Sequence, residues 1–293
     1  MFTIRRLDRS LIVLFSVFTF MAFAQRYAQE RVDWNRPMKP FRIAGNIYYV
    51  GAAGVSSFLI TTPQGAILID GGLPETAPLI EKSIAQLGFK IADVKYLLNS
   101  HAHFDHAGGL AELKRLSGAQ VVASAGDSET LRTGVDSFLG PEGSFPPVKV
   151  DRVIGENETI RLGETVLTAH LTPGHTRGST TWAMPVSDRT NVYQAVFHSS
   201  TTVAANRLVQ NRNYPQIVSD YRASFAKLRK LPCDIFLAPH GSFFQLAEKL
   251  QKRTDSGPNP FIDSGELKRF VDKSEQDFEK ELKEQESKVE RAE

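Results

Sequence analysis

The chain carries only one cysteine, Cys233, among its 293 residues. A lone thiol cannot form an internal disulfide, so the fold must rely on its hydrophobic core and on any metal that it binds. The scarcity of cysteine also argues against a structural zinc site, because such sites are often built from several cysteines. We expect Cys233 to be a small buried residue beside a strand rather than a nucleophile.

A hydrophobic run long enough to cross a membrane is missing from the N-terminal region. Its apolar stretch, residues 11–23, has about 13 residues, whereas a membrane helix needs roughly 20. This stretch follows three arginines and ends in Ala22-Phe23-Ala24, which is typical of a secretory signal with its cleavage site. We predict that residues 1–24 are a cleaved signal peptide, that the protein is exported to the periplasm, and that no stable membrane anchor remains. A retained anchor is the alternative.

A strong net charge of one sign is absent as well. The whole chain has a formal charge of +2, and residues 1–24 carry this excess, so the remainder is formally neutral. A neutral chain gives no electrostatic reason to expect binding to nucleic acid. The remaining length and its hydrophobic content suffice for a substantial core, and no linker divides it. We therefore predict a single domain over residues 25–293.

Segments with strand patterns alternate along the chain with segments that have helical spacing. Strands are predicted where β-branched and aromatic residues run between Gly and Pro turns, and helices where apolar residues recur every three or four positions. The predicted strands cover residues 41–50, 56–61, 66–69, 94–98, 148–153, 159–162, 165–171, 180–184, 192–197 and 235–238. The predicted helices cover residues 77–87, 108–116 and 214–231, and a C-terminal helix begins after Asp263.

Two β-rich halves that each end in helices indicate an α/β fold, with two sheets packed face to face and helices outside. The C-terminal helix has apolar positions such as Leu267 and Val271. Glu266 follows Asp263 by three residues, which is the pattern of a capped helix start. We expect the charged last stretch, residues 279–293, to fray into solvent.

Histidine is scarce in the chain but strongly clustered. Three of the seven histidines lie in the run Ser100-His101-Ala102-His103-Phe104-Asp105-His106. The run follows a predicted buried strand and precedes Gly108-Gly109, so we expect a short turn at the carboxyl end of that strand. Imidazole and carboxylate groups are ligands that suit zinc, and a turn can point all four at one small volume. We therefore predict a metal site rather than a set of solvated loop histidines.

Two more histidines occupy the same kind of position. His175 lies in Thr172-Pro173-Gly174-His175-Thr176 and His240 lies in Ala238-Pro239-His240-Gly241, each directly after a strand. With the first cluster they supply five imidazoles and one carboxylate, too many for one tetrahedral zinc and the right number for two zincs with three protein ligands each. Water would fill the open positions, and zinc lowers the pKa of such a water to about 7. The reaction class that this arrangement implies is hydrolysis.

At this point the chain resembles a known family, the metallo-β-lactamase superfamily. The resemblance runs from Trp34 through the C-terminal helix. It is carried by Leu68-Ile69-Asp70-Gly71-Gly72, His101-Ala102-His103-Phe104-Asp105-His106, Thr172-Pro173-Gly174-His175-Thr176 and Pro239-His240-Gly241. Within the superfamily the chain looks most like the true β-lactamases of subclass B3. The resemblance implies an αβ/βα four-layer sandwich, with two mixed β-sheets and helices outside.

The resemblance to subclass B3 also implies how the ligands divide between two Zn²⁺ ions. One ion would be held by His101, His103 and His175, and the other by Asp105, His106 and His240. The implied reaction is hydrolysis of the β-lactam ring of penicillins, cephalosporins and carbapenems by a zinc-bound hydroxide, which would confer antibiotic resistance. Asp105 would be the catalytic carboxylate that orients the hydroxide. The expected partner is a small-molecule β-lactam, bound by a monomer.

The same resemblance places the substrate carboxylate on two hydroxyls, one residue apart, just after a strand of the second half. Counting back from Asn206 assigns this role to Ser200 and Thr202. A shift of one residue would assign Ser199 and Thr201 instead. Asn206 would add a donor near the lactam carbonyl.

Three further polar residues lie near or between these motifs. Asp70, at the end of an apolar strand, either orients metal ligands or is a plain turn residue. His170 and His198 are not among the ligands, and we expect core or surface roles for both.

The main alternative is another hydrolase of the same superfamily, such as a glyoxalase-II-like thioesterase or a lactonase. Those enzymes typically bridge their two metals with an additional Asp after the corresponding strand, whereas residues 197–201 of this chain contain no carboxylate. This departure favours the lactamase. A structural zinc protein is disfavoured because structural sites are usually closed, whereas six ligands shared by two ions leave open positions. A nuclease is disfavoured because the chain carries an export signal and no excess positive charge.

Overall fold

Two β-sheets packed face to face form the centre of the computed structural model, which describes residues 29–135, 143–254 and 256–291. The strand order is β1-β2-β3-β4-β5-β6-β7 in the first sheet and β12-β11-β10-β9-β8 in the second. The first sheet consists of β1 (Phe41–Ala44), β2 (Ile47–Tyr49), β3 (Phe58–Thr62), β4 (Gly65–Ile69), β5 (Val94–Leu98), β6 (Gln120–Ser124) and β7 (Arg152–Ile154). The second consists of β8 (Thr159–Leu162), β9 (Thr165–Leu171), β10 (Thr180–Asp188), β11 (Asn191–Phe197) and β12 (Ile235–Leu237).

Both sheets mix parallel and antiparallel pairs. In the first sheet, β1 to β4 pair antiparallel and β4 to β7 pair parallel. In the second, only the β11 and β12 pair is parallel. Two mixed sheets are therefore the core of the fold, as the resemblance to the metallo-β-lactamase superfamily implied.

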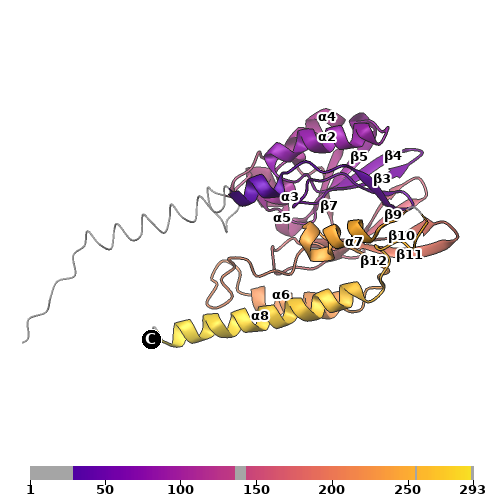
Figure 1. The fold of residues 1–293 in the computed structure, drawn as a ribbon. Helices are drawn as coiled ribbons and strands as arrows, with labels where there is room; N and C mark the ends of the chain where they lie inside the picture. Colours follow the sequence, from indigo (N-terminus) through magenta and orange to yellow (C-terminus); the bar gives the residue numbers. More distant parts are fainter. Residues whose placement is uncertain (1–28, 136–142, 255, 292–293) are drawn as a thin grey trace, which may run out of the picture.

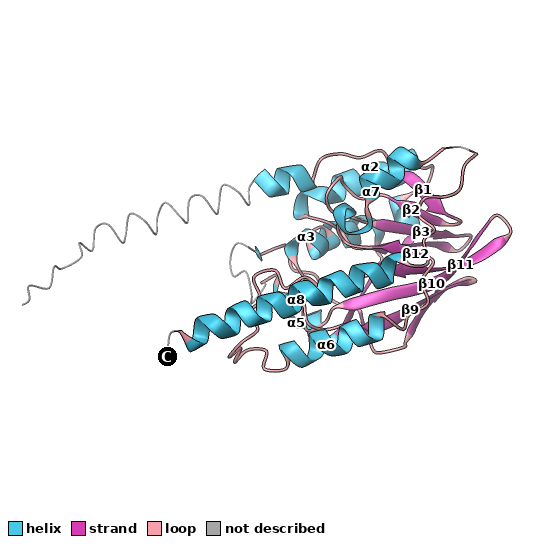
Figure 2. Cartoon of the chain, turned by 60° about the horizontal axis from the view of Figure 1, so that its bottom comes forward, coloured by secondary structure: helices cyan, strands magenta, loops and turns pink. Residues whose placement is uncertain are grey.

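Helices cover the outer faces of both sheets (Figure 1). The longer ones are α2 (Ala77–Gln86), α4 (Leu110–Ser117), α5 (Ala125–Thr133), α6 (Ile217–Leu228), α7 (Leu246–Lys252) and α8 (Glu266–Glu290). The short ones are α3 (Phe104–Ala107), η1 (Pro74–Thr76), η2 (Ile91–Asp93) and η4 (Gly241–Phe244). Helices α2 and α4 lie side by side over the first sheet, and α6 and α8 lie side by side over the second (Figures 1 and 2). The predicted αβ/βα four-layer sandwich is confirmed.

The strand β4 shows why the sheets sit between two apolar layers. Ile67 and Ile69 belong to the core between the two sheets, whereas Ala66 and Leu68 belong to the core beneath α2 and α4. Successive side chains of a strand point to opposite faces, so a strand that is covered on both sides must be apolar throughout. Trp182 of β10 is fully buried between the sheets and anchors the inner layer.

The turns after β4, β5, β9, β11 and β12 meet at one end of the sandwich. The carbonyl of Ser100, just after β5, accepts hydrogen bonds from the Thr180 amide at 2.8 Å and from the Ser199 hydroxyl at 3.0 Å. These bonds join the two sheets at that end. The histidine motifs all lie in these turns, so the fold itself brings them together.

The structure contains elements that the sequence patterns did not predict. Strand β6, helix α5 and helix α7 are additional. The strand predicted at residues 148–153 is shorter, because the amide of Val148 bonds to the carbonyl of Leu131 in α5 at 2.8 Å and pairing with β6 begins only at Arg152. The predicted strands at residues 94–98, 159–162 and 165–171 agree with β5, β8 and β9.

The prediction that residues 279–293 fray into solvent is wrong for the part that the structure describes. Helix α8 continues without a break to Glu290. Its apolar face stays buried as far as Leu282, which is 6% exposed. One turn further on, the Gln285 side chain accepts a hydrogen bond from the amide of Leu208 at 2.7 Å and donates one to the carbonyl of Asn206 at 3.0 Å. The end of the helix is therefore tied to a loop rather than free.

Two other predictions concern the N-terminal segment and the single cysteine. The predicted signal peptide, residues 1–24, lies outside the described residues. Within the described part of the chain, no helix has both the length and the apolar character needed to cross a membrane.

Cys233 is buried next to β12, and this burial raises the pKa of its thiol to about 12. The prediction that it is a small buried residue is confirmed.

Candidate metal centre

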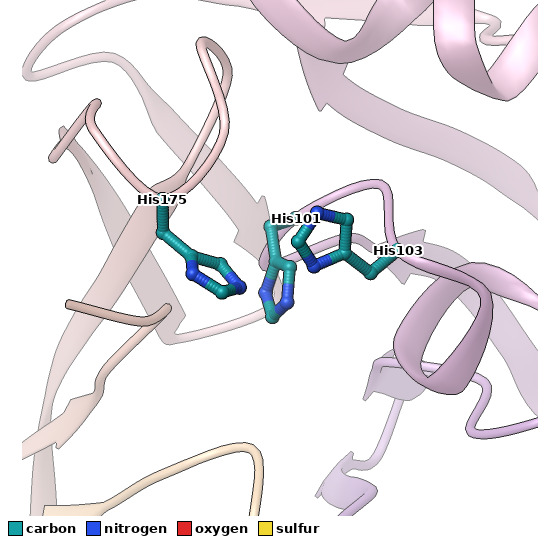
Figure 3. A group of neighbouring side chains, drawn as sticks. All are labelled: His101, His103 and His175. Atoms are coloured by element: carbon teal, nitrogen blue, oxygen red, sulfur yellow. The ribbon is translucent and has the colours of Figure 1, made fainter. Parts of the chain in front are cut away.

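Three histidines from two turns form the first group of the site. His101 and His103 follow β5, and His175 follows β9. Each offers a ring nitrogen that lies within 4.8 Å of the other two, and all three side chains are buried. Their ring centroids are 4.9, 4.7 and 4.5 Å apart, and Figure 3 shows the three rings turned toward one another. Such an arrangement fits one metal ion with three nitrogen ligands.

A second group lies directly beside the first and contains the carboxylate. Oδ2 of Asp105 is 3.1 Å from Nε2 of His106 and 3.3 Å from Nε2 of His240. The three ligand atoms again lie within 4.8 Å of one another. The ring centroids of His101 and His106 are 4.3 Å apart, so the two groups share a border. The structure thus brings all six predicted ligand residues together in two groups of three.

Hydrogen bonds to the backbone fix the orientation of two of the rings. Nδ1 of His175 lies 2.7 Å from the carbonyl oxygen of Thr202, and Nδ1 of His240 lies 3.1 Å from that of Gly54. A carbonyl oxygen only accepts, so both Nδ1 atoms carry the proton and both Nε2 atoms keep a free lone pair. A backbone partner of this kind is typical of metal-binding histidines.

Among the residues that the structure describes, two buried histidine ring nitrogens have no hydrogen-bond partner. These are Nε2 of His101 and Nδ1 of His106. The other ring nitrogen of His101 is 3.0 Å from the Ser100 hydroxyl, so this ring too is oriented from one side and open on the other. A buried polar atom without a partner costs stability, and a metal ion in the first group would supply the missing partner of Nε2 of His101. The donor set therefore fits bound metal.

The charge states of the site also suit metal binding. Burial, together with the neighbouring histidines, holds the pKa of His101 and His175 well below the usual value, so both rings are neutral. Burial alone would raise the pKa of Asp105, but the charge and hydrogen bonds of His106 and His240 hold it well below its usual range. Neutral imidazoles and an ionised carboxylate are the forms in which these groups bind a metal.

Asp70 helps to hold the turn that carries the first group. It is 2% exposed and has a positive φ of 62°, and its Oδ1 accepts a hydrogen bond from the Ser100 amide at 2.7 Å. Ser100 in turn contacts the ring of His101. Burial raises the pKa of Asp70 to about 6. Of the two interpretations of Asp70, the structure supports orientation of a ligand.

Asp127, in the first turn of α5, joins the turns of the first group, and the sequence patterns did not identify it. Its carboxylate accepts hydrogen bonds from the amides of Ala102 and Gly178 at 2.8 and 2.9 Å and from the Thr176 hydroxyl at 3.0 Å. An acidic residue in the first turn of a helix is common, so nothing in its own motif marks it. The feature of the sequence that reflects the contact is Gly178. A Cβ at this position would lie 2.3 Å from the backbone nitrogen of Asp127, so the close approach requires glycine.

The segment after β11 contains the residues predicted to bind substrate. The hydroxyls of Ser200 and Thr202 are 3.2 Å apart, and the Thr202 hydroxyl is 3.2 Å from Nδ1 of His175. Both amide hydrogens of Asn206 are used within the protein, toward the carbonyl of His175 at 3.0 Å and the Tyr221 hydroxyl at 3.3 Å. All three predicted residues therefore lie at the first group.

The two remaining histidines take no part in the site. His198 is 2% exposed and its ring packs on Phe236 and Phe270, and burial lowers its pKa to about 3. His170 lies 3.8 Å from Glu156 at the surface of β9. The predicted core and surface roles are confirmed.

A cavity of about 1140 Å³ opens beside the first group. His103, His175 and Asn206 line one part of its wall, and the loop that ends at Pro215 lines another. A cavity of this size exceeds the few hundred Å³ that a small ligand occupies. Two groups of metal ligands next to an open cavity form a site that can act on a small molecule.

Comparisons with known proteins agree with this geometry. The family model described as metallo-beta-lactamase superfamily matches residues 50–189. The chain is 43% identical to BJP-1, a subclass B3 metallo-beta-lactamase of Bradyrhizobium japonicum, with a TM-score of 0.85 over 88% of this chain and 98% of that one. It is also 43% identical to the FEZ-1 metallo-beta-lactamase from Legionella gormanii, with a TM-score of 0.84 over 86% of this chain and 98% of that one.

Curated relatives of the chain include enzymes with another name. A hydroxyacylglutathione hydrolase from Bradyrhizobium sp. (strain BTAi1) is 28% identical over 182 residues, which cover 61% of this chain and 59% of the relative. The acyl-coenzyme A thioesterase MBLAC2 of Gallus gallus is 30% identical over 145 residues, 45% of this chain and 50% of the relative. The chain thus spans less than two thirds of these relatives. The near-complete match to BJP-1 at 43% identity, together with the family model, shows that the chain belongs to the metallo-beta-lactamase superfamily.

Proposed function

We propose that the chain hydrolyses the β-lactam ring of penicillins, cephalosporins and carbapenems and so confers antibiotic resistance. The observation that carries the proposal is the pair of ligand groups, combined with the lack of a carboxylate in the segment after β11. The similarity to proteins named subclass B3 metallo-beta-lactamases, over nearly their whole length, supports it.

We propose two Zn²⁺ ions as the cofactor, one in each group of three ligands. Five imidazoles and one carboxylate without any thiolate are a donor set that suits zinc, and three protein ligands leave an open position on each ion. When bound, zinc lowers the pKa of a water molecule to about 7 and polarises a carbonyl group.

Asp105 is the catalytic residue of the proposal. Its Oδ2 contacts Nε2 of both His106 and His240, which leaves Oδ1 to accept a hydrogen bond from the attacking water. Because the surrounding histidines keep the pKa of Asp105 low, the carboxylate remains an acceptor at neutral pH. It can therefore orient the water toward the lactam carbonyl.

Ser200 and Thr202 are proposed to bind the carboxylate that β-lactam substrates carry. Their hydroxyls pair with each other at 3.2 Å next to His175, so both lie at the border of the first ligand group. They are neutral donors, which orient a carboxylate without adding a charge. Asn206 remains a predicted substrate-binding residue, but it must release His175 or Tyr221 before it donates to a substrate.

Thioester hydrolysis is the second candidate function. The curated relatives named hydroxyacylglutathione hydrolase and acyl-coenzyme A thioesterase favour it. The segment from His198 to Thr202 weighs against it, because none of its side chains is a carboxylate that could bridge two metals. The structural relatives also match over a larger share of their length than the thioesterases do.

The two functions are separated by parallel assays on the purified chain loaded with zinc. A chromogenic cephalosporin and a carbapenem should both be turned over, and a thioester should not. Chelation should abolish turnover and added zinc should restore it, whereas inhibitors that acylate a serine nucleophile should have no effect. Thioester or lactone turnover by a protein with two zincs bound, without β-lactam turnover, would refute the proposal.

We further propose that the mature protein acts as a monomer in the periplasm. The basis for the export is the signal pattern of residues 1–24. Cell fractionation should place the processed chain in the periplasm, and mass spectrometry should find an N-terminus near residue 25. An unprocessed chain in the cytoplasm would refute the export.

A further inference from the structure

We propose that three arginines around the cavity form a binding site for a second anionic group of the substrate. The residues are Arg177, Arg207 and Arg212, and we call them the arginine rim. The chemical class that they select is a β-lactam with a carboxylate or sulfonate on its acyl side chain. This inference rests on the proposed function and specifies which β-lactams the site prefers.

The arginine rim lines the same cavity as the first ligand group. All three arginines line the cavity of about 1140 Å³, as do His103 and His175. Arg177 follows His175 by two residues, and Arg207 and Arg212 lie on the loop between β11 and α6. A molecule that fills the cavity beside the ligand histidines must pass or touch this rim.

Within the described residues, the charges of the rim are not neutralised by the protein. Arg177, Arg207 and Arg212 form no ion pair there, although thirteen other arginines and lysines do. Among the described residues that line the cavity, Asp127 is the one acidic residue. Its carboxylate already accepts three hydrogen bonds. A concave surface lined by charges of one sign focuses their field and attracts the opposite charge.

Arg177 is held at the cavity by an aromatic ring. Its guanidinium lies over the Tyr214 ring, 5.0 Å from the centroid. The Tyr214 hydroxyl donates a hydrogen bond to Asp220 at 2.7 Å, which fixes the ring from its other end. The contact is with a ring rather than with a hydrogen-bond acceptor, so the N–H groups of Arg177 remain available for a ligand, and they match the two oxygens of a carboxylate.

The loop that carries the other two arginines is also fixed. Arg207 donates from Nε to the carbonyl of Val209 at 2.8 Å and from a terminal nitrogen to Gln210 at 3.1 Å. The residues on either side of Arg207 are held by Gln285 of α8, which accepts from the amide of Leu208 at 2.7 Å and donates to the carbonyl of Asn206 at 3.0 Å. A guanidinium has five N–H donors, so Arg207 keeps donors for a ligand. Binding to a pre-ordered rim loses less conformational entropy.

The rim is distinct from the groups assigned to the common carboxylate of β-lactams. Ser200 and Thr202, which are proposed to bind that carboxylate, do not line the cavity that the rim surrounds. A substrate with one anionic group can satisfy those hydroxyls and leave the rim unused. A substrate with a second anionic group on its side chain can satisfy both.

The test compares two penicillins that differ by one carboxylate, benzylpenicillin and α-carboxybenzylpenicillin, on the zinc-loaded full chain. The measured quantity is kcat/KM for the dianion divided by kcat/KM for the monoanion. Arg177→Gln and Arg212→Gln should each lower this ratio about threefold, and the double variant about tenfold, which is the scale of exposed ion pairs. Raising the ionic strength from about 0.05 M to about 0.5 M should also lower it in the wild type.

Two further variants separate charge from structure. Arg161→Gln removes an exposed arginine on β8 that neither lines the cavity nor forms an ion pair among the described residues, so the ratio should stay at the wild-type value. Arg177→Lys retains the charge and should retain part of the preference that Arg177→Gln loses.

The outcomes distinguish this inference from the proposed function. A ratio that is the same in the wild type, the double variant and at high ionic strength would overturn the arginine rim and leave the function intact. If neither penicillin is hydrolysed, the proposed function fails, and calorimetric binding of both to the metal-free chain then tests the rim. Tighter binding of the dianion that the double variant loses supports the rim, and equal affinity overturns it.

Discussion

The two ligand groups share a border but are built from different chemistry. The first consists of three histidines, and burial keeps His101 and His175 neutral. The second contains the ionised carboxylate of Asp105. Neutral ligands leave the full charge of a bound cation available to polarise a carbonyl, whereas Asp105 cancels one unit and adds an acceptor for the attacking water. The difference indicates that the two groups have separate roles in one reaction.

The two groups also differ in how the protein braces them. Buried carboxylates support the first group, since Asp127 joins its turns and Asp70 holds the residue before His101. His240 of the second group is more exposed, with 16% of its side chain accessible, and is oriented by the carbonyl of Gly54. We therefore expect the second group to lose its metal more readily than the first.

The largest effect should come from Asp105→Asn. The change keeps the shape of the side chain and removes the charge that both orients the water and binds the second metal, so kcat should fall by at least about a hundredfold. Steady-state kinetics with a chromogenic cephalosporin at saturating zinc measure it. A kcat within about threefold of the wild type would show that Asp105 is not catalytic.

Removal of single ligands tests the division into two groups. His240→Ala should lower zinc occupancy of the second group much more than that of the first, and the loss of affinity should exceed the roughly 10–100-fold cost of losing an outer partner. Metal analysis after dialysis, with His101→Ala as the matched variant of the first group, gives both occupancies. Equal loss of both ions in His240→Ala would contradict the division.

A smaller effect is expected when the bracing of the first group is weakened. Asp127→Asn replaces a carboxylate that accepts three hydrogen bonds with an amide whose NH₂ faces donors, so zinc affinity of the first group should fall about 10–100-fold. Competition with a chelator measures the affinity. Asp151→Asn is the control, because Asp151 accepts from the Val121 amide on another part of the first sheet. Equal zinc affinities of Asp127→Asn and Asp151→Asn would show that Asp127 does not brace the first group.

The smallest effect concerns the substrate hydroxyls. Ser200→Ala and Thr202→Val should each raise KM for a cephalosporin by about tenfold with little change in kcat, since each removes one hydrogen bond to a charged group. Ser199→Ala tests the alternative alignment, because the Ser199 hydroxyl already donates to the carbonyl of Ser100 at 3.0 Å. A larger rise in KM for Ser199→Ala than for Ser200→Ala would favour the alignment shifted by one residue.

The six ligands could be predicted from the sequence because each lies in a short motif at the end of a strand, whereas their division into two groups was implied by the resemblance to subclass B3. The run from His101 to His106 carries four ligands, and Pro and Gly mark the turns around His175 and His240. A short turn that follows a buried strand restricts the directions in which its side chains can point. The strand patterns predicted two sheets and most of their strands, and the resemblance to the metallo-β-lactamase superfamily implied that both sheets are mixed.

Contacts between distant segments could not be predicted in this way. Asp127 meets Gly178 across 51 positions of sequence, and Gln285 meets Leu208 across 77. Nothing near either residue distinguishes it from an ordinary helical Asp or Gln. The prediction that the end of α8 frays failed for this reason, since its partner is a loop in another part of the chain.

The most direct test of the central claim follows two substrates during zinc addition to the metal-free chain. A carbapenem and a thioester are assayed in parallel as the bound zinc, measured by metal analysis, rises to two ions per chain. The two-group site predicts carbapenem turnover that depends on bound zinc and reaches its maximum at two ions, with no thioester turnover. Thioester turnover without carbapenem turnover at two bound zincs would contradict it.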